Sequence, residues 1–257
     1  MGRVIKLVIY YFLYNLVFMG VVFGVYGFVN HTSDMPQSGP VYFNLSMWVQ
    51  LFATLALGIH LLAWKYVTRK DLSFDFPNTA KVLLASVVLS VGMGLWTNYL
   101  TELTELPNVM EDLFNKMMYN PLGVISIVVM APIVEELLFR GGMQGHLLRK
   151  WKNPAWAILV SALIFGIVHG NPVQMFFASI LGLVLGWVYY RTGSLLPCIL
   201  MLHTVKTTPT RARQMAPVVP KASVMVSSSP PDRWKSNTEV PLLIKCINMQ
   251  GNRLPVR

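Results

Sequence analysis

Charged residues are scarce in this chain. Asp, Glu, Lys and Arg make up 12% of its 257 residues, about half of what a soluble globular domain carries. Hydrophobic residues make up 54%, and the mean hydropathy is +0.52. Cysteine is also rare, because only Cys198 and Cys246 occur, and this excludes a disulfide-stabilised scaffold. The composition therefore indicates a membrane protein rather than a soluble domain.

Long apolar runs fill the chain up to residue 204. A transmembrane helix needs about 20 apolar residues, so the runs predict an all-α, polytopic transmembrane helix bundle of six to seven spans. The last run holds only about ten apolar residues before the composition changes, and we expect it to be cut short. The expected spans are 4–28, 43–64, 81–100, 121–148, 155–170, 172–190 and 194–204.

The chain divides into three parts by composition. Residues 1–78 form an N-terminal transmembrane anchor hairpin, and residues 79–205 form a core that carries the ionisable groups described below. Residues 206–257 are basic and rich in Pro and Ser, which is typical of a disordered tail. A single-base deletion just before codon 206 is the other explanation of this tail, and sequencing of the gene would decide between them.

The formal net charge of +10 does not indicate a nucleic-acid-binding protein, because no soluble fold with a basic face is predicted. Outside the tail the basic residues gather in alternate connections between spans. By the positive-inside rule this pattern places the N-terminus in the cytoplasm and makes the lipid bilayer the first partner. These residues are Arg3, Lys6, Lys65, Arg69, Lys70, Lys81, Arg149, Lys150, Lys152 and Arg191.

Two adjacent glutamates, Glu135 and Glu136, lie inside one of the most apolar stretches, with Arg140 shortly after them. A carboxylate in hydrocarbon costs several kcal/mol unless it is paired, protonated or next to water. Glu136 and Arg140 are four residues apart and can pair on a helix, whereas Glu135 lies about 100° round the helix and is left for chemistry. A structural ion pair that joins two helices is the alternative interpretation.

Two later apolar runs end in a histidine. His169 follows Phe165 by one turn and precedes Gly170-Asn171-Pro172, which breaks the helix. His203 ends the last run. Each histidine alone is equally typical of a membrane interface, and Phe165 alone is typical of packing. Together with the glutamates, they are the groups that polarise a water molecule, directly or through a metal.

These motifs resemble those of the CAAX protease and bacteriocin-processing family, whose best-known members are type II CAAX prenyl endopeptidases. The similar elements are Glu-Glu-x-x-x-Arg at 135–140, Phe-x-x-x-His at 165–169 and a histidine at 203. The resemblance covers about residues 80–203 and identifies the core as an intramembrane protease. It implies an endopeptidase that acts on membrane-associated peptides or proteins, in an integral membrane protein of the bacterial plasma membrane.

The resemblance also implies roles for the residues. Glu135 would activate water with the help of His169, Glu136 and Arg140 would support the site, and His203 would stabilise the oxyanion. The family usually carries an asparagine four residues after this histidine, and this chain has Thr207 there. No cofactor is certain; a zinc ion held by Glu135, His169 and His203, as in a metalloprotease, is the alternative to glutamate chemistry, although no His-Glu-x-x-His motif is present.

Three other functions compete with proteolysis. Some proteins of the same broad family are known only for immunity or protection, without catalysis. A member that lacks its last span would be inactive. Buried Glu, Arg and His side chains and broken helices also occur in transporters, but the sequence shows no inverted repeat.

Overall fold

The computed structural model describes residues 1–103 and 111–208, without the side chains of residues 102 and 111–114. The described residues are helical, with no strand among them, and this confirms the predicted all-α class. Most of the expected tail, and Cys246 with it, lies outside the described residues.

Seven helical runs match the expected spans. The N-terminal pair is α1 (Gly2–Val29) and α2 (Gly39–Ala63), followed by the 3-10 turn η1 (Arg69–Leu72) and α3 (Thr79–Leu103). A continuous run then covers α5 (Pro121–Val124), η2 (Ile125–Met130), α6 (Ala131–Glu136), η3 (Leu137–Gln144) and α7 (Gly145–Lys150), in which η2 and η3 are π-helical. The last three helices are α8 (Pro154–Ile167), α9 (Pro172–Thr192) and α10 (Leu196–Thr207).

Five of the described helices are long and apolar enough to cross a membrane, namely α1, α2, α3, the run Pro121–Lys150 and α9. The apolar helices α8 and α10 are shorter. Large hydrophobic side chains are exposed along α1 and α3, as expected for surfaces that face lipid. The fold is thus a polytopic membrane helix bundle.

Prolines and asparagines set the helix starts. A proline stands in the first turn of α2, α5, α8, α9 and α10, where its missing N–H has no intrahelical partner to lose. The side chains of Asn120 and Asn153 cap α5 and α8 by accepting hydrogen bonds from the amides of Leu122 and Ala155. Gly193 ends α9 with a left-handed φ of 67°.

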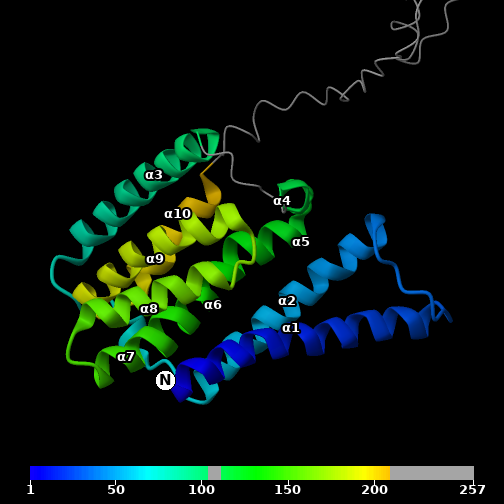
Figure 1. The fold of residues 1–257 in the computed structure, drawn as a ribbon, viewed down its shortest axis with the longest axis horizontal. Coiled ribbons are helices and arrows are strands. Elements are labelled where there is room, and N and C mark those ends of the chain that lie inside the picture. The colour runs from blue at the N-terminus through cyan, green and yellow to red at the C-terminus, as the bar shows by residue number, and fades with distance from the viewer. Residues whose placement is uncertain (104–110, 209–257) are drawn as a thin grey trace, which may run out of the picture. The chain divides into compact units, whose positions relative to one another are not determined.

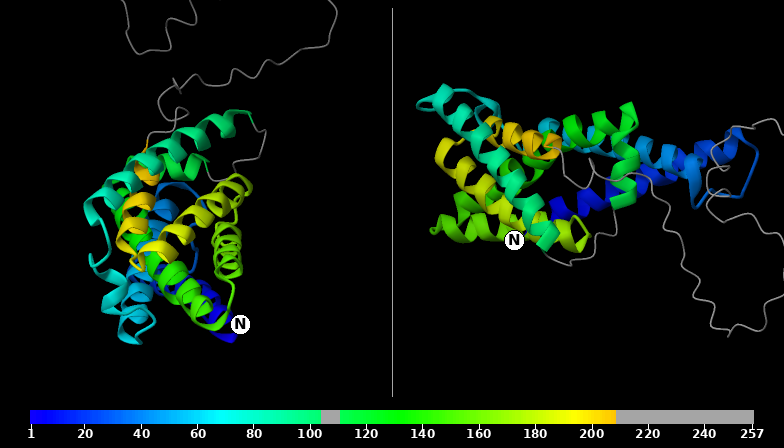
Figure 2. Two further views of the ribbon diagram at one scale, coloured as in Figure 1. Left: turned by 90° about the vertical axis from the view of Figure 1, so that its left-hand side faces the viewer. Right: turned by 90° about the horizontal axis from the view of Figure 1, so that it is seen from above.

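The core of the bundle lies around α6 and η3. In Figure 1 the N-terminal pair α1 and α2 runs alongside this central run, and both helices contact it. Helices α8 and α9 pack closely against each other, and Figure 2 shows α3 against α10 on the outside. The central run is therefore contacted by the N-terminal hairpin as well as by α8, α9 and α10.

Two elements differ from the expected boundaries. A short helix, α4 (Glu111–Met118), precedes the central run at a place where no span was expected. Helix α10 continues to Thr207, two residues past the expected end of the core at 205. The extension is consistent with three threonine hydroxyls, those of Thr204, Thr207 and Thr208, that donate to carbonyls of the preceding turn.

Several basic connections meet at one end of the bundle. Arg3 donates to the carbonyl of Tyr66, and its guanidinium lies 4.6 Å from the Tyr66 ring centroid. The Tyr189 hydroxyl donates to Asp71, and the Ser194 hydroxyl donates to the carbonyl of Ser73, both at 2.7–2.8 Å. The N-terminus, the connection after α2 and the turn after α9 thus lie on the same side of the bundle.

Candidate active site

Helix α6 places the two glutamates on different sides. Glu136 is fully buried, whereas the side chain of Glu135 keeps 18% of its exposure. The two carboxylates therefore have different partners, as the helical spacing of 100° per residue requires. Glu136 faces the bundle interior and Glu135 faces α10.

A chain of contacts links Glu136 to His169. The Arg140 guanidinium donates to Glu136 Oε1 at 2.7 Å and to the Gly182 carbonyl at 3.4 Å. It also lies 4.3 Å from the ring centroid of Phe165. The Phe165 ring stands edge-on to the His169 imidazole, with 4.9 Å between centroids. The structure thus brings Glu136, Arg140, Phe165 and the partly buried His169 together in one group, and an arginine over an aromatic face is favourable there.

Gln144 extends this buried polar row and was missed in the sequence. It lies one turn after Arg140, is fully buried, and donates to the carbonyl of Gly186 at 2.7 Å. The spacing 136, 140, 144 was the available signal, together with Gly182 and Gly186 one turn apart on α9. Small residues at this spacing let two helices approach closely.

Both site histidines are oriented by backbone carbonyls. His169 Nδ1 lies 2.6 Å from the carbonyl of Phe165, and His203 Nδ1 lies 2.7 Å from the carbonyl of Val128. A carbonyl can only accept, so in each case Nδ1 carries the proton and donates it. The Nε2 atom of each neutral ring then keeps its lone pair.

Lys206 on α10 is the second residue that was missed. Its Nζ lies 2.7 Å from Glu135 Oε1, and both side chains are about four-fifths buried, at 19% and 18% exposure. Lys206 follows His203 by three residues and so lies on the same face of α10, which was the signal available. It lies at the expected start of the tail, where the sequence predicts no site residue.

Thr207 is placed away from this pair. Its hydroxyl donates to the carbonyls of His203 and Thr204 in its own helix, and the residue is exposed. Lys206, rather than Thr207, is the side chain of α10 that contacts Glu135.

No hydrogen bond joins Glu135 and His169 among the described residues. His203 contacts η2 through Val128 and not the carboxylate of Glu135.

The residues expected for a zinc site are not arranged around a common point in the described part of the chain. Within residues 1–103 and 111–208, no group of three His, Cys, Asp or Glu side chains is arranged to hold a metal ion. Glu135 Oε1 is bound to Lys206 instead, whereas the Nδ1–carbonyl hydrogen bonds of the two histidines leave each Nε2 available, as in a metal-binding histidine. The donor set Glu135, His169 and His203 does not fit a shared ion in this arrangement.

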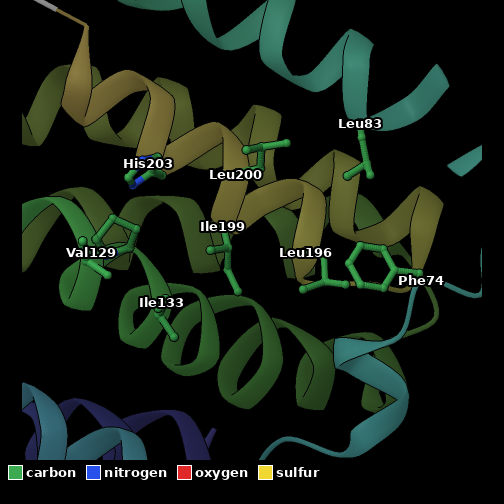
Figure 3. A pocket seen from close by; sticks show the side chains of 9 residues that line it. Phe74, Leu83, Val129, Ile133, Leu196, Ile199, Leu200 and His203 are labelled. Atoms are coloured by element: carbon green, nitrogen blue, oxygen red, sulfur yellow. The ribbon is translucent and has the colours of Figure 1, made fainter. Parts of the chain in front are cut away.

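An apolar pocket of about 290 Å³ opens beside His203. Figure 3 shows His203 at one end of the pocket and Phe74 at the other, with side chains of α10 along one wall. Its lining is almost wholly apolar and comes from the connection after η1, from α3, η2, α6 and α10. The lining residues are Phe74, Leu83, Val129, Pro132, Ile133, Leu196, Ile199, Leu200 and His203.

Residues 118–206 match a family model described as type II CAAX prenyl endopeptidase Rce1-like. The matched segment runs from the end of α4 into α10 and contains Glu135, Arg140, His169 and His203. Over this CAAX-protease segment the chain is similar to the family. The match confirms the resemblance inferred from the motifs, and it leaves α1, α2 and α3 outside the matched segment.

A curated relative is similar to part of the chain. The protein named "Putative membrane peptidase YdiL" from Bacillus subtilis (strain 168) is 36% identical over 72 residues. The match covers 28% of this chain and 29% of the relative, so the chain matches less than a third of the relative's length. No solved structure matches the chain.

Proposed function

We propose that this protein is an intramembrane endopeptidase that hydrolyses peptide bonds of membrane-associated substrates, with Glu135 as the general base. The observation that carries the proposal is the state of Glu135. It is a mostly buried carboxylate within the CAAX-protease segment, and one of its oxygens, Oε2, has no hydrogen-bond partner among the described residues. A carboxylate kept in an apolar bundle with one oxygen free is suited to accept a proton from water.

In this proposal, Glu135 alone accounts for the proton transfers of the hydrolysis. Glu135 takes one proton from a water molecule as the water oxygen bonds to the carbon of the scissile carbonyl. The carbonyl electrons move to its oxygen, which becomes the oxyanion. When the C–N bond breaks, the proton held by Glu135 passes to the leaving nitrogen, which leaves as an amine, and the carboxylate is restored.

The histidines act through Nε2 in this proposal. Because Nδ1 of His169 donates to a carbonyl, its Nε2 keeps a lone pair and can accept a hydrogen bond from the hydroxyl group of the tetrahedral intermediate. His203 presents Nε2 at the apolar pocket, and in its protonated form it donates to the oxyanion. Such donors typically contribute about 3 kcal/mol to the transition state.

The substrate segment is apolar in this proposal. The pocket beside His203 has the volume of a small ligand site and almost no polar lining, so it suits an apolar side chain or a lipid chain. The description of the matching family, which names prenyl endopeptidases, agrees with such a substrate. The relative's name and organism agree with a peptidase of the bacterial plasma membrane.

The test is cleavage of membrane peptides by the purified protein in lipid vesicles. We expect Glu135→Gln and His169→Ala to lower the cleavage rate at least a hundredfold while membrane insertion stays unchanged. Asp75→Asn and His31→Ala make the same chemical changes in exposed connections and should retain full activity. Full activity in either site variant removes the catalytic assignment.

Two further arms separate the alternatives. A chelator should leave the rate unchanged if Glu135 acts without a metal, and a loss restored by zinc would favour the metal alternative. Protection of cells from a bacteriocin that survives Glu135→Gln would favour a non-catalytic immunity protein. Absence of cleavage for every membrane peptide tried with the wild type would favour an inactive member.

A further inference from the structure

The free oxygen of Glu135 faces the N-terminal hairpin. Lys206 binds Oε1 from the α10 side. Oε2 is buried without a hydrogen-bond partner in the described part of the chain, and Glu135 lines a small cavity between α1, α2 and α6. This cavity is distinct from the apolar pocket, because Pro132 and Ile133 line the pocket whereas Val134 and Leu138 line the cavity.

The cavity is polar on the hairpin side. Four polar side chains reach it from helices that lie outside the CAAX-protease segment: Tyr11 and Asn15 on α1, and Gln50 and Thr54 on α2. Apolar side chains of α2, α6 and η3 complete the lining, among them Leu57 and Leu138. Polar side chains gathered round a carboxylate inside a membrane bundle point to a bound polar ligand.

The size of the cavity selects the ligand. Its volume is about 20 Å³, whereas a cavity needs roughly 10–15 Å³ measured in this way to hold one water molecule. A peptide group or a larger solute does not fit. One water molecule does, and the site offers the two to four polar partners that a buried water requires.

The hydrogen bonds within α1 and within α2 leave polar groups of the cavity available to a water molecule. Asn15 Nδ2 donates to the Tyr11 carbonyl, and Gln50 Nε2 donates to Thr54 Oγ1. The amide oxygens of both side chains therefore remain as acceptors, and the Thr54 hydroxyl keeps its own proton to donate. A water here can donate to Glu135 Oε2 and to one amide oxygen while it accepts from Thr54.

Helix association does not account for these residues. Polar side chains in membrane bundles commonly join two helices by hydrogen bonds. Here each of the two bonds stays within its own helix, Asn15 to Tyr11 on α1 and Gln50 to Thr54 on α2. In the described residues no hydrogen bond of these side chains crosses between α1 and α2, so their polar groups are not used to hold the hairpin together.

We propose that the α1–α2 hairpin binds the water molecule that Glu135 activates, with Oε2 as the atom that takes the proton. The proposal rests on the proposed protease function for the fate of this water. It gives the N-terminal hairpin a part in catalysis beyond anchoring, since Thr54, Gln50 and Asn15 hold and orient the nucleophile.

The test uses Thr54→Val, which removes the hydroxyl and keeps the shape, and Gln50→Leu. We expect each to lower kcat about tenfold with KM unchanged, since the water and not the peptide loses its partner. The matched control Thr101→Val makes the same change on α3, where the hydroxyl donates to a carbonyl of its own helix, and should leave both constants unchanged.

A second measurement is independent of activity. Hydroxyl-radical labelling generated from water by X-ray exposure oxidises side chains beside internal waters. Leu57 and Leu138 line the cavity and are 3% and 1% exposed, whereas Leu147 is equally buried elsewhere. We expect oxidation of Leu57 and Leu138 but not of Leu147, and at least a fivefold loss of it in the combined Thr54→Val, Gln50→Leu protein.

The outcomes separate the two proposals. Absence of Leu57 and Leu138 oxidation in the wild type, or oxidation that persists unchanged in the combined variant, overturns the water site. Unchanged kcat in both single variants overturns its role in hydrolysis. The expected labelling in a protein that cleaves no peptide supports the water site and counts against the protease function alone.

Discussion

At the scale of single residues, the environments of Glu135 and Glu136 decide their roles. Arg140, the ion-pair partner of Glu136, also contacts Phe165 of α8 and the carbonyl of Gly182 of α9. The pair is therefore part of the packing between these helices. Removal of one partner from such a buried pair leaves an uncompensated charge and typically costs about 3–5 kcal/mol. We therefore expect Glu136 and Arg140 to belong to the framework that supports the site, whereas Glu135 keeps 18% of its side-chain exposure and lines the hairpin cavity.

Lys206 is expected to hold Glu135 in position. Its ammonium group fixes Oε1 and so turns Oε2 toward the hairpin cavity. We expect Lys206→Met to lower kcat about tenfold, because a misplaced base loses rate steeply, and Lys206→Arg to retain most of the activity. The measurement is steady-state cleavage in vesicles, with KM determined alongside. A Lys206→Met protein that is as fast as the wild type, or faster, would mean that the cation restrains the base instead of supporting it.

At the scale of elements, close packing of α8 on α9 holds His169 near the central run. Gly166 lies three residues before His169, and a Cβ built on it would come 2.5 Å from the carbonyl oxygen of Met175, and closer still to the Ser179 hydroxyl. Only a residue without a side chain allows this approach. The position of His169 thus depends on a glycine in the neighbouring turn.

Gly166→Ala should therefore disturb both stability and the site. We expect it to lower the free energy of unfolding by about 1–3 kcal/mol, as overpacking does, and to reduce cleavage by moving His169. Gly92→Ala is the matched control, because a Cβ at Gly92 meets nothing within 4 Å and alanine favours a helix by about 1 kcal/mol. Thermal unfolding in detergent measures the difference. Equal unfolding temperatures for the two variants would contradict this account of the packing.

At the scale of the whole molecule, the basic connections and the tertiary contacts agree on one arrangement. Arg3 reaches the connection after α2, and Asp71 of that connection reaches α9. The contacts bring these connections to one end of the bundle, and by the positive-inside rule we expect that end to face the cytoplasm. We then expect the connection between α1 and α2 to lie on the opposite side of the membrane.

Cysteine labelling in intact cells tests this orientation. Asp34→Cys lies in the exposed connection after α1, and Lys152→Cys lies in the exposed connection after α7. A membrane-impermeant maleimide should label position 34 in intact cells and position 152 only after the cells are opened, with the parent chain measured in parallel. The reverse pattern would place the N-terminus outside.

The sequence alone determined the helical class, the positions of the seven apolar runs and the resemblance of the core to the CAAX-protease family. It also determined the Glu136–Arg140 pair, because partners four residues apart meet on any helix. These features depend on local periodicity and on motifs within single segments, so they can be inferred without knowing how the helices pack. The residue at which α10 ends was harder to predict from the sequence. The change of composition after His203 outweighed the weak helical preference of residues 205–207.

Tertiary structure alone decided the partners of Glu135. Lys206 is 71 residues away along the chain, and the polar side chains of the hairpin lie on helices that carry no recognisable motif. The same packing decided that Glu135, His169 and His203 do not form a metal-binding set in the described residues. Contacts between helices depend on how each helix is rotated and on how closely it approaches its neighbour, and small residues such as Gly166 and Gly182 allow a close approach. Periodicity along one segment carries no information about the rotation of the neighbouring helix.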